Sequence, residues 1–189
     1  MTFETFDKCM LLVRAWRTRN GKEDYQWPDS RDPAITSTLE EFGVVPQDLE
    51  KSMVVLAAFR EAEDDVYQAM STILQVIKNR QLKGKLRDHI SAVDHECQFP
   101  TMTVNNMQYN FFPGKTDNFS RILENLDQIL ENKVVDLTQG ATYFGQVSNL
   151  PPWLRRKIDS GEVERTTQAG KFTFYKEKNV VHNSSFNAL

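Results

Sequence analysis

The sequence predicts a mostly helical α+β fold in a single domain of 189 residues. Apolar residues recur at helical spacing through residues 51–80 and again through 118–132. A strand-like alternation of apolar and polar residues appears only near the C-terminus, in residues 162–176. With 40% hydrophobic residues, a chain of this length can bury one substantial core. We therefore expect several helices packed together with a small, irregular β lobe.

The first fifty residues are expected to form a helical extension that packs on the core. Residues 1–18 have an apolar side typical of an amphipathic helix, and residues 17–33 form a long polar loop rich in turn-forming residues. Residues 36–42 predict a short helix, which ends at Gly43 because glycine readily adopts the left-handed conformation of a helix C-cap.

The central stretch, residues 51–80, predicts two helices that meet at an acidic corner. Pro46 suits the first turn of the first helix, and Asp64 and Asp65 are candidate N-caps for the second. The second helix has an apolar stripe at spacing i, i+3, i+4, i+7 and i+11: Val66, Ala69, Met70, Ile73 and Ile77. This arrangement places Glu61 in the last turn of the first helix.

Glu61 is the residue whose predicted position suggests chemistry. The C-terminal end of a helix disfavours an ionised carboxylate, and the acidic residues 63–65 add like charge. A carboxyl group that keeps its proton near neutral pH can act as the acid in the cleavage of a glycosidic bond. From spacing alone, however, a solvated and capped turn is the more common outcome for such a corner.

Four blocks of residues between 51 and 176 occur in the order and spacing of a known family. They are Glu61 and Ala62 followed by Asn79 and Arg80, then Gln98 and Phe99, then residues 136–144 (DLTQGATYF), and then Pro152 and Trp153 followed by KFTFYK. In these blocks the chain resembles the SleB-type cell wall hydrolases, the family of spore cortex-lytic enzymes. Two departures are the acidic run after Ala62 and Thr173, which stands where the family commonly has histidine.

The resemblance implies a lysozyme-like fold, similar to that of lytic transglycosylases, over residues 51–176. It implies that Glu61 is the catalytic acid for cleavage between N-acetylmuramic acid and N-acetylglucosamine in peptidoglycan glycan strands. The residues that it implies for the sugar site are Gln98, Phe99, Tyr143, Trp153 and Tyr175. Two alternatives stay open from the residues themselves: Gln98 as a satisfied polar group inside the lobe, and Trp153 as a residue that seals the core.

The mechanism depends on whether a second carboxylate takes part. A hydrolase needs one to activate water or to act as the nucleophile, and Asp94, Glu96 and Asp136 are the candidates. A lytic transglycosylase needs only Glu61, because the 6-hydroxyl of the muramic acid attacks, and the resemblance favours this version. A third hypothesis is a wall-binding or virion structural protein that keeps the fold without the activity.

No cofactor or metal is expected. The cluster of histidine, acidic and cysteine side chains in residues 89–97 lacks a recognised zinc spacing, and the distant Cys9 and Cys97 do not suggest a disulfide. The net charge of −3 argues against a nucleic-acid partner. The sequence gives no indication of the oligomeric state.

The cellular setting expected from the sequence is that of a bacteriophage protein. No apolar run is long enough to cross a bilayer, so stable membrane insertion is not expected, and the N-terminus lacks the pattern of a signal peptide. We therefore expect synthesis in the host cytoplasm, with holin-dependent release at lysis or packaging in a virion. Residues 179–189 have no pattern and are expected to form a flexible tail.

Overall fold

The computed structural model describes residues 1–20, 28, 30, 32–62, 66–84, 99–102, 112–146 and 148–178. It is mostly helical with one small antiparallel sheet, which confirms the predicted mostly helical α+β class. The helices are α1 (Phe3–Asn20), η1 (Pro33–Ile35), α2 (Thr36–Phe42), α3 (Pro46–Ala62), α4 (Tyr67–Leu82), η2 (Pro100–Met102), α6 (Asp117–Leu130) and α7 (Pro152–Asp159). The strands are β1 (Tyr143–Gln146), β2 (Val163–Ala169) and β3 (Phe172–Glu177).

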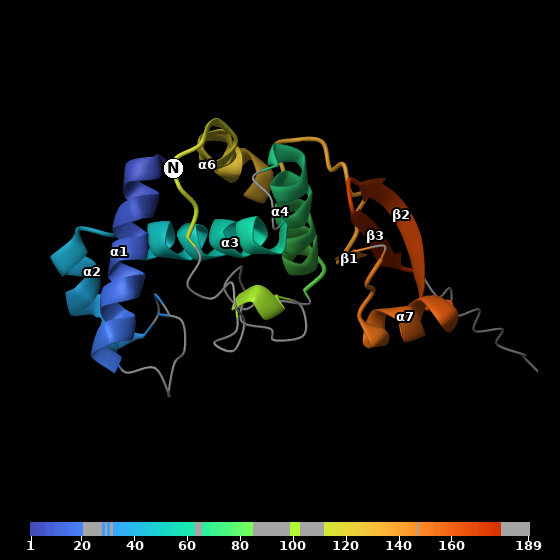
Figure 1. The fold of residues 1–189 in the computed structure, drawn as a ribbon, viewed down its shortest axis with the longest axis horizontal. Coiled ribbons are helices and arrows are strands. Elements are labelled where there is room, and N and C mark those ends of the chain that lie inside the picture. The colour runs from blue at the N-terminus through green and yellow to red at the C-terminus, as the bar shows by residue number, and fades with distance from the viewer. Residues whose placement is uncertain are drawn as a thin grey trace, which may run out of the picture.

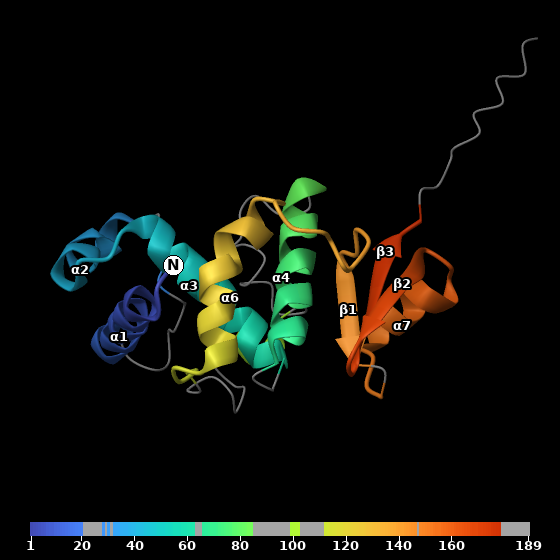
Figure 2. The ribbon, with the colours of Figure 1, turned by 90° about the horizontal axis from the view of Figure 1, so that it is seen from above.

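The elements follow one another along an elongated molecule. Figure 1 shows α1 and α2 at one end, α3 running through the middle, and the sheet with α7 at the other end. Seen from above in Figure 2, α6 lies across α3, and α4 stands between α6 and the sheet. The N-terminal amino group of Met1 donates a hydrogen bond to the carbonyl of Leu123 in α6 at 3.2 Å, so the start of the chain is tied to the core.

Helix α3 is the central element of the core. Every residue from 52 to 60 is buried, because α1, α4, α6 and η2 all pack against this helix. The helix begins at Pro46, as predicted, since a proline at the first helical position loses no hydrogen bond. The preceding helix α2 ends at Gly43, whose φ of +60° is the left-handed C-cap that the sequence predicted.

Helix α4 differs from the sequence prediction in two respects. The predicted N-caps Asp64 and Asp65 lie outside the described residues, and Val66 occupies the N-cap position without a side-chain hydrogen bond. The helix is also buried on more than its apolar stripe, since all residues from 70 to 80 are buried. The extra buried face is polar, and it packs against the segment that joins α6 to the sheet.

The sheet has the strand order β1, β3, β2, and both pairs are antiparallel. Alternation along β3 places Phe172 and Phe174 in the main hydrophobic core and Tyr175 in a separate cluster. That second cluster lies between the sheet and α7 and includes Leu154. The sheet is therefore sandwiched between the helical core and α7.

Two positions around β1 are occupied by glycine for different structural reasons. At Gly140 a Cβ would have no neighbour within 4 Å, and the φ of +79° is what favours glycine there. The close approach is at Gly145, where a Cβ would lie 2.7 Å from Cδ2 of Leu150. Gly145 thus lets the segment after β1 fold back tightly against the sheet.

Candidate active site

Glu61 lies in the last turn of α3, as the sequence predicted, and its side chain is half-buried. The chain before it is held rigidly, because residues 52–60 are all buried. A carboxyl group at this point extends from the end of a fixed helix. This position suits a catalytic group, since sites on rigid elements keep their geometry better than sites on loops.

Thr101 holds the carboxylate of Glu61 with two hydrogen bonds. Its backbone N–H donates to Oε1 at 3.2 Å, and its hydroxyl donates to the same oxygen at 2.5 Å. The hydroxyl group can donate to a carboxylate or accept from a carboxylic acid, so this partner suits either protonation state of Glu61. The short helix η2, which carries Thr101, therefore fixes where Glu61 points.

Sequence reasoning missed Thr101, although it lies only two residues after the Gln98 and Phe99 block of the family resemblance. It follows Phe99 and Pro100 directly. Pro100 suits the start of a helical turn, and a threonine just inside such a turn can present its N–H and hydroxyl to one acceptor. The signal was therefore present, but the partner was forty residues away in the sequence.

Phe99 is wholly buried, and its ring centroid lies 6.0 Å from that of Phe144 in β1. In this position it supports η2 from the core side. A direct contact between Phe99 and a sugar stays a prediction. Gln98, the other predicted binding residue of this block, lies outside the described residues, as do Asp94 and Glu96.

Tyr143, Trp153 and Tyr175 come together on the α7 face of the sheet. Tyr143 pairs with Tyr175 in the β1–β3 register, and the ring of Trp153 lies 5.8 Å from that of Tyr143. The Tyr143 hydroxyl donates to Oε1 of Glu177 at 2.5 Å. These three aromatic residues thus form a group of their own, on the opposite face of the sheet from the residues that pack toward α4. Their role as sugar contacts stays a prediction.

Asp136, one of the candidate second acids, holds a turn instead. It accepts hydrogen bonds from the N–H and hydroxyl of Thr138, the N–H of Gly140 and the amide of Asn79, at distances of 2.6–2.9 Å. Burial raises the pKa of Asp136, but these hydrogen bonds outweigh it and hold the pKa below the usual value. Asp136 is therefore an ionised structural carboxylate.

Asn79 and Gln75 attach the segment after α6 to α4. The amide of Asn79 donates to Asp136, to the hydroxyl of Thr138 and to the carbonyl of Ala141. Gln75 donates to the carbonyl of Val135, and it accepts from the N–H of Leu137. Two of the blocks in the family resemblance, Asn79 and residues 136–144, are thus direct partners in the structure.

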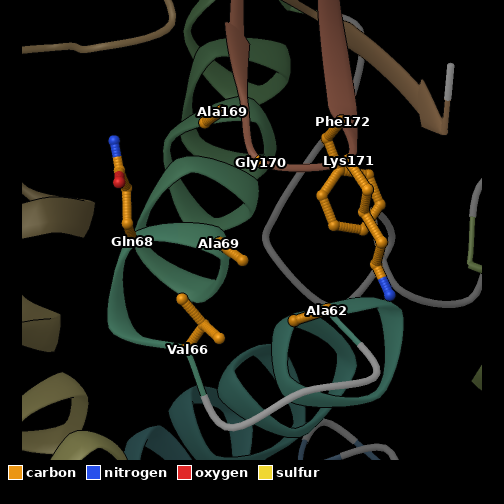
Figure 3. Close-up of a pocket in the computed structure, with 8 residues that line it drawn as sticks. All are labelled: Ala62, Val66, Gln68, Ala69, Ala169, Gly170, Lys171 and Phe172. Carbon is orange, nitrogen blue, oxygen red and sulfur yellow. The ribbon is translucent and has the colours of Figure 1, made fainter.

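A pocket opens where the β2–β3 hairpin meets the junction of α3 and α4. Its lining is Ala62, Val66, Gln68, Ala69, Ala169, Gly170, Lys171 and Phe172 (Figure 3). The lining includes Ala62, the residue that follows Glu61 in α3, but it does not include Glu61 itself. Its volume of about 110 Å³ is well below the roughly 300–1,000 Å³ typical of small-molecule sites, so it can take one substituent of a sugar but not a whole ring.

Within the part of the chain that the structure describes, no group of three or more histidine, cysteine or acidic side chains is arranged to hold a metal ion. Among those same residues, no helix has the length and apolar character needed to span a bilayer. Comparisons with known protein families, with curated proteins and with solved structures find no match for this chain.

Proposed function

We propose that this protein cleaves the glycan strand of peptidoglycan between N-acetylmuramic acid and N-acetylglucosamine, as a lytic transglycosylase of lysozyme-like fold. The observation that carries the proposal is Glu61, a half-buried acid in the last turn of a buried helix, held by two hydrogen bonds from Thr101. The order of the four sequence blocks supports it independently. The proposed setting is a bacteriophage endolysin or a virion-associated lysin.

In the proposed reaction Glu61 acts first as an acid and then as a base. It gives its proton to the bridging oxygen as the bond from C1 of the muramic acid to that oxygen breaks and an oxocarbenium-like centre develops. The 6-hydroxyl of the same sugar then attacks C1, and Glu61 takes the proton that this hydroxyl loses. The products are a 1,6-anhydromuramic acid end and a free 4-hydroxyl, and no water is consumed.

The state of Asp136 supports the version with one carboxylate. A hydrolase needs a second acid that is available to activate water or to attack C1. Asp136 accepts four hydrogen bonds within its own turn and from α4, so it is committed to structure. A hydrolytic muramidase would have to draw its second acid from Asp94 or Glu96, and it remains the nearest alternative.

The non-catalytic alternative rests on a different observation. The pocket at the junction of α3 and α4 is small, and the acidic run after Ala62 and the threonine at position 173 both depart from the family pattern. A wall-binding or virion structural protein would keep the fold and bind glycan without cutting it. Activity on purified cell walls separates this alternative from the enzyme.

The first test is Glu61→Gln, with Glu124→Gln as the control on the exposed face of α6. We expect the wild type and the control to clear purified peptidoglycan, and Glu61→Gln to lose at least about 100-fold in rate, because removing a general acid typically costs 10²–10⁴-fold. The melting temperature of Glu61→Gln should stay within a few degrees of the wild type, since the amide can still accept from Thr101.

Mass spectrometry of the released fragments decides the reaction type. Anhydro ends support the transglycosylase, whereas reducing ends with added water would establish the hydrolase instead. If the wild type binds cell walls and clears none, the non-catalytic protein is the correct interpretation. If Glu61→Gln clears walls as fast as the wild type, the assignment of Glu61 is wrong.

A further inference from the structure

Three arginine side chains surround one phenylalanine ring close to Glu61. The guanidinium carbons of Arg14, Arg17 and Arg60 lie 4.5, 5.9 and 5.2 Å from the centroid of the Phe112 ring. Arg14 and Arg17 come from α1, whereas Arg60 comes from the last turn of α3. A cation within about 6 Å of an aromatic centroid is attracted by the electron density of the ring. We call these four residues the Phe112 cluster.

Arg60 is the member of the Phe112 cluster that reaches the candidate site. Its side chain is fully buried, although arginine is among the residues that are least often buried. Burial, together with the nearby charge of Arg17, lowers the pKa of Arg60 to about 9. A buried cation is stable only where its surroundings compensate the lost hydration, so the position of Arg60 is closely determined by its neighbours.

Arg60 and Glu61 contact consecutive residues of η2. Nη1 of Arg60 donates to Sδ of Met102 at 3.5 Å, and Glu61 accepts from the N–H and hydroxyl of Thr101. The two side chains at the end of α3 therefore hold two adjacent residues of one short helix. A shift of Arg60 would move Met102 and, with it, the donors that fix Glu61.

We propose that the Phe112 cluster positions Glu61 through η2, so that α1 serves as part of the catalytic support and not only as an extension of the core. Arg14, Phe112 and Arg60 are then positioning residues that act on Glu61 through Met102 and Thr101. The catalytic meaning of this coupling rests on the proposed function. The coupling itself can be measured without any activity.

Hydrogen exchange of the Thr101 amide measures the coupling directly, because that N–H donates to Glu61. Arg14→Gln should raise its exchange rate by about two- to fivefold, the worth of one exposed cation–π contact, and Phe112→Leu should raise it further. The amide of Val55, buried in the middle of α3, should exchange as in the wild type. Lys8→Gln is the matched control, since Lys8 lies on α1 and pairs only with Glu4 among the described ion pairs.

Kinetics on purified glycan strands test the consequence for catalysis. Arg14→Gln and Phe112→Leu should lower kcat by about the same factors that raise the Thr101 exchange rate, with KM unchanged, because they misplace the acid without touching the sugar site. The conservative variants Arg14→Lys and Phe112→Tyr should keep most of the wild-type kcat, since the lysine retains the positive charge and the tyrosine retains the aromatic ring of the cation–π contact. Lys8→Gln should match the wild type.

The outcomes separate the two proposals. If the wild type cuts no glycan, the proposed function fails, and the exchange rate of Thr101 still decides the coupling. The inference is overturned if Phe112→Leu and Arg14→Gln leave the Thr101 exchange rate unchanged. It is also overturned if they raise the Thr101 and Val55 rates equally, because that pattern reports a general loss of stability.

Discussion

Single side chains organise the segment between α6 and β1, and Asp136 is the clearest case. Its carboxylate accepts hydrogen bonds from two backbone N–H groups, a hydroxyl and an amide. The sequence offered Asp136 as a second acid because its type is right for catalysis, and only the structure shows that its hydrogen-bonding capacity is already used. A residue's type indicates what it can do, whereas its partners determine what it does.

Asp136→Asn should destabilise the protein by about 1–3 kcal/mol at pH 7, because an amide cannot accept all four hydrogen bonds. The pKa of Asp136 is lowered in the folded state, so its stabilisation is present above the unfolded pKa and is lost as the pH falls through the folded pKa. Urea unfolding between pH 2 and pH 7 should show that the free energy of unfolding of Asp136→Asn falls less on acidification than that of the wild type.

The control for this prediction is Asp159→Asn at the exposed end of α7. It should follow the wild-type curve at every pH. An Asp136→Asn variant as stable as the wild type at pH 7 would show that the turn does not depend on this carboxylate.

At the scale of elements, local signals predicted most boundaries correctly. Pro46 and Gly43 mark a helix start and a helix end because their backbone preferences hold in any context. The apolar stripe of α6 is also confirmed, with Ile122, Leu123 and Leu126 buried. Signals of this kind come from a residue and its near neighbours, which the sequence contains in full.

The parts that could not be predicted all depend on contacts between distant residues. The buried polar face of α4 is an example, since Gln75 and Asn79 look like solvent-facing residues until the segment 135–141 is placed against them. The site shows the same limit: Glu61 was predicted from its helix, but Thr101 was not, because the pairing spans forty residues. Periodicity cannot report which surfaces meet.

Gly145→Ala should destabilise the sheet and α7 by about 1–3 kcal/mol, the usual cost of overpacking. The added Cβ would lie 2.7 Å from Cδ2 of Leu150 and 3.4 Å from a side-chain carbon of Leu154. The double variant Gly145→Ala, Leu150→Ala removes the side chain that the new Cβ would meet, so it should recover part of the lost stability. Thermal unfolding measures both variants.

Gly114→Ala is the matched control, because a Cβ there meets nothing within 4 Å and the φ angle is ordinary. It should change the melting temperature little. If Gly145→Ala matches this control, the segment after β1 has room that the structure does not show.

At the scale of the whole molecule, α1 belongs to the main core. Five of its side chains are no more than 1% exposed: Phe6, Cys9, Met10, Leu12 and Val13. The Phe6 ring lies 4.9 Å from that of Phe119 in α6, which in turn lies 5.5 Å from Phe59 in α3. The N-terminal helix is therefore packed into one core with α6 and with α3, the helix that carries Glu61.

Removal of residues 1–20 should prevent cooperative folding. Burial of each large apolar side chain contributes roughly 1.5–3 kcal/mol, so losing five buried residues approaches or exceeds the whole stability of a typical domain, about 5–15 kcal/mol. Far-UV circular dichroism during urea titration should show no sharp transition for this truncation. The full-length variant Asp7→Ala, Lys8→Ala, changed only on the exposed side of α1, should unfold as the wild type does. A truncated chain with a sharp transition would show that the rest of the chain folds without α1.

The attachment of the sheet to α4 limits how the protein can move. Gln75 and Asn79 lie one helical turn apart on α4. Each forms hydrogen bonds with the segment that leads into β1, at a different level along the helix. Sliding this segment along α4 would break the hydrogen bonds of both residues at once, so the segment before β1 is fixed to α4. In the proposed enzyme, widening beside Glu61 to admit a glycan strand would therefore involve displacement of η2 or of the end of α3, and not sliding of this segment along α4.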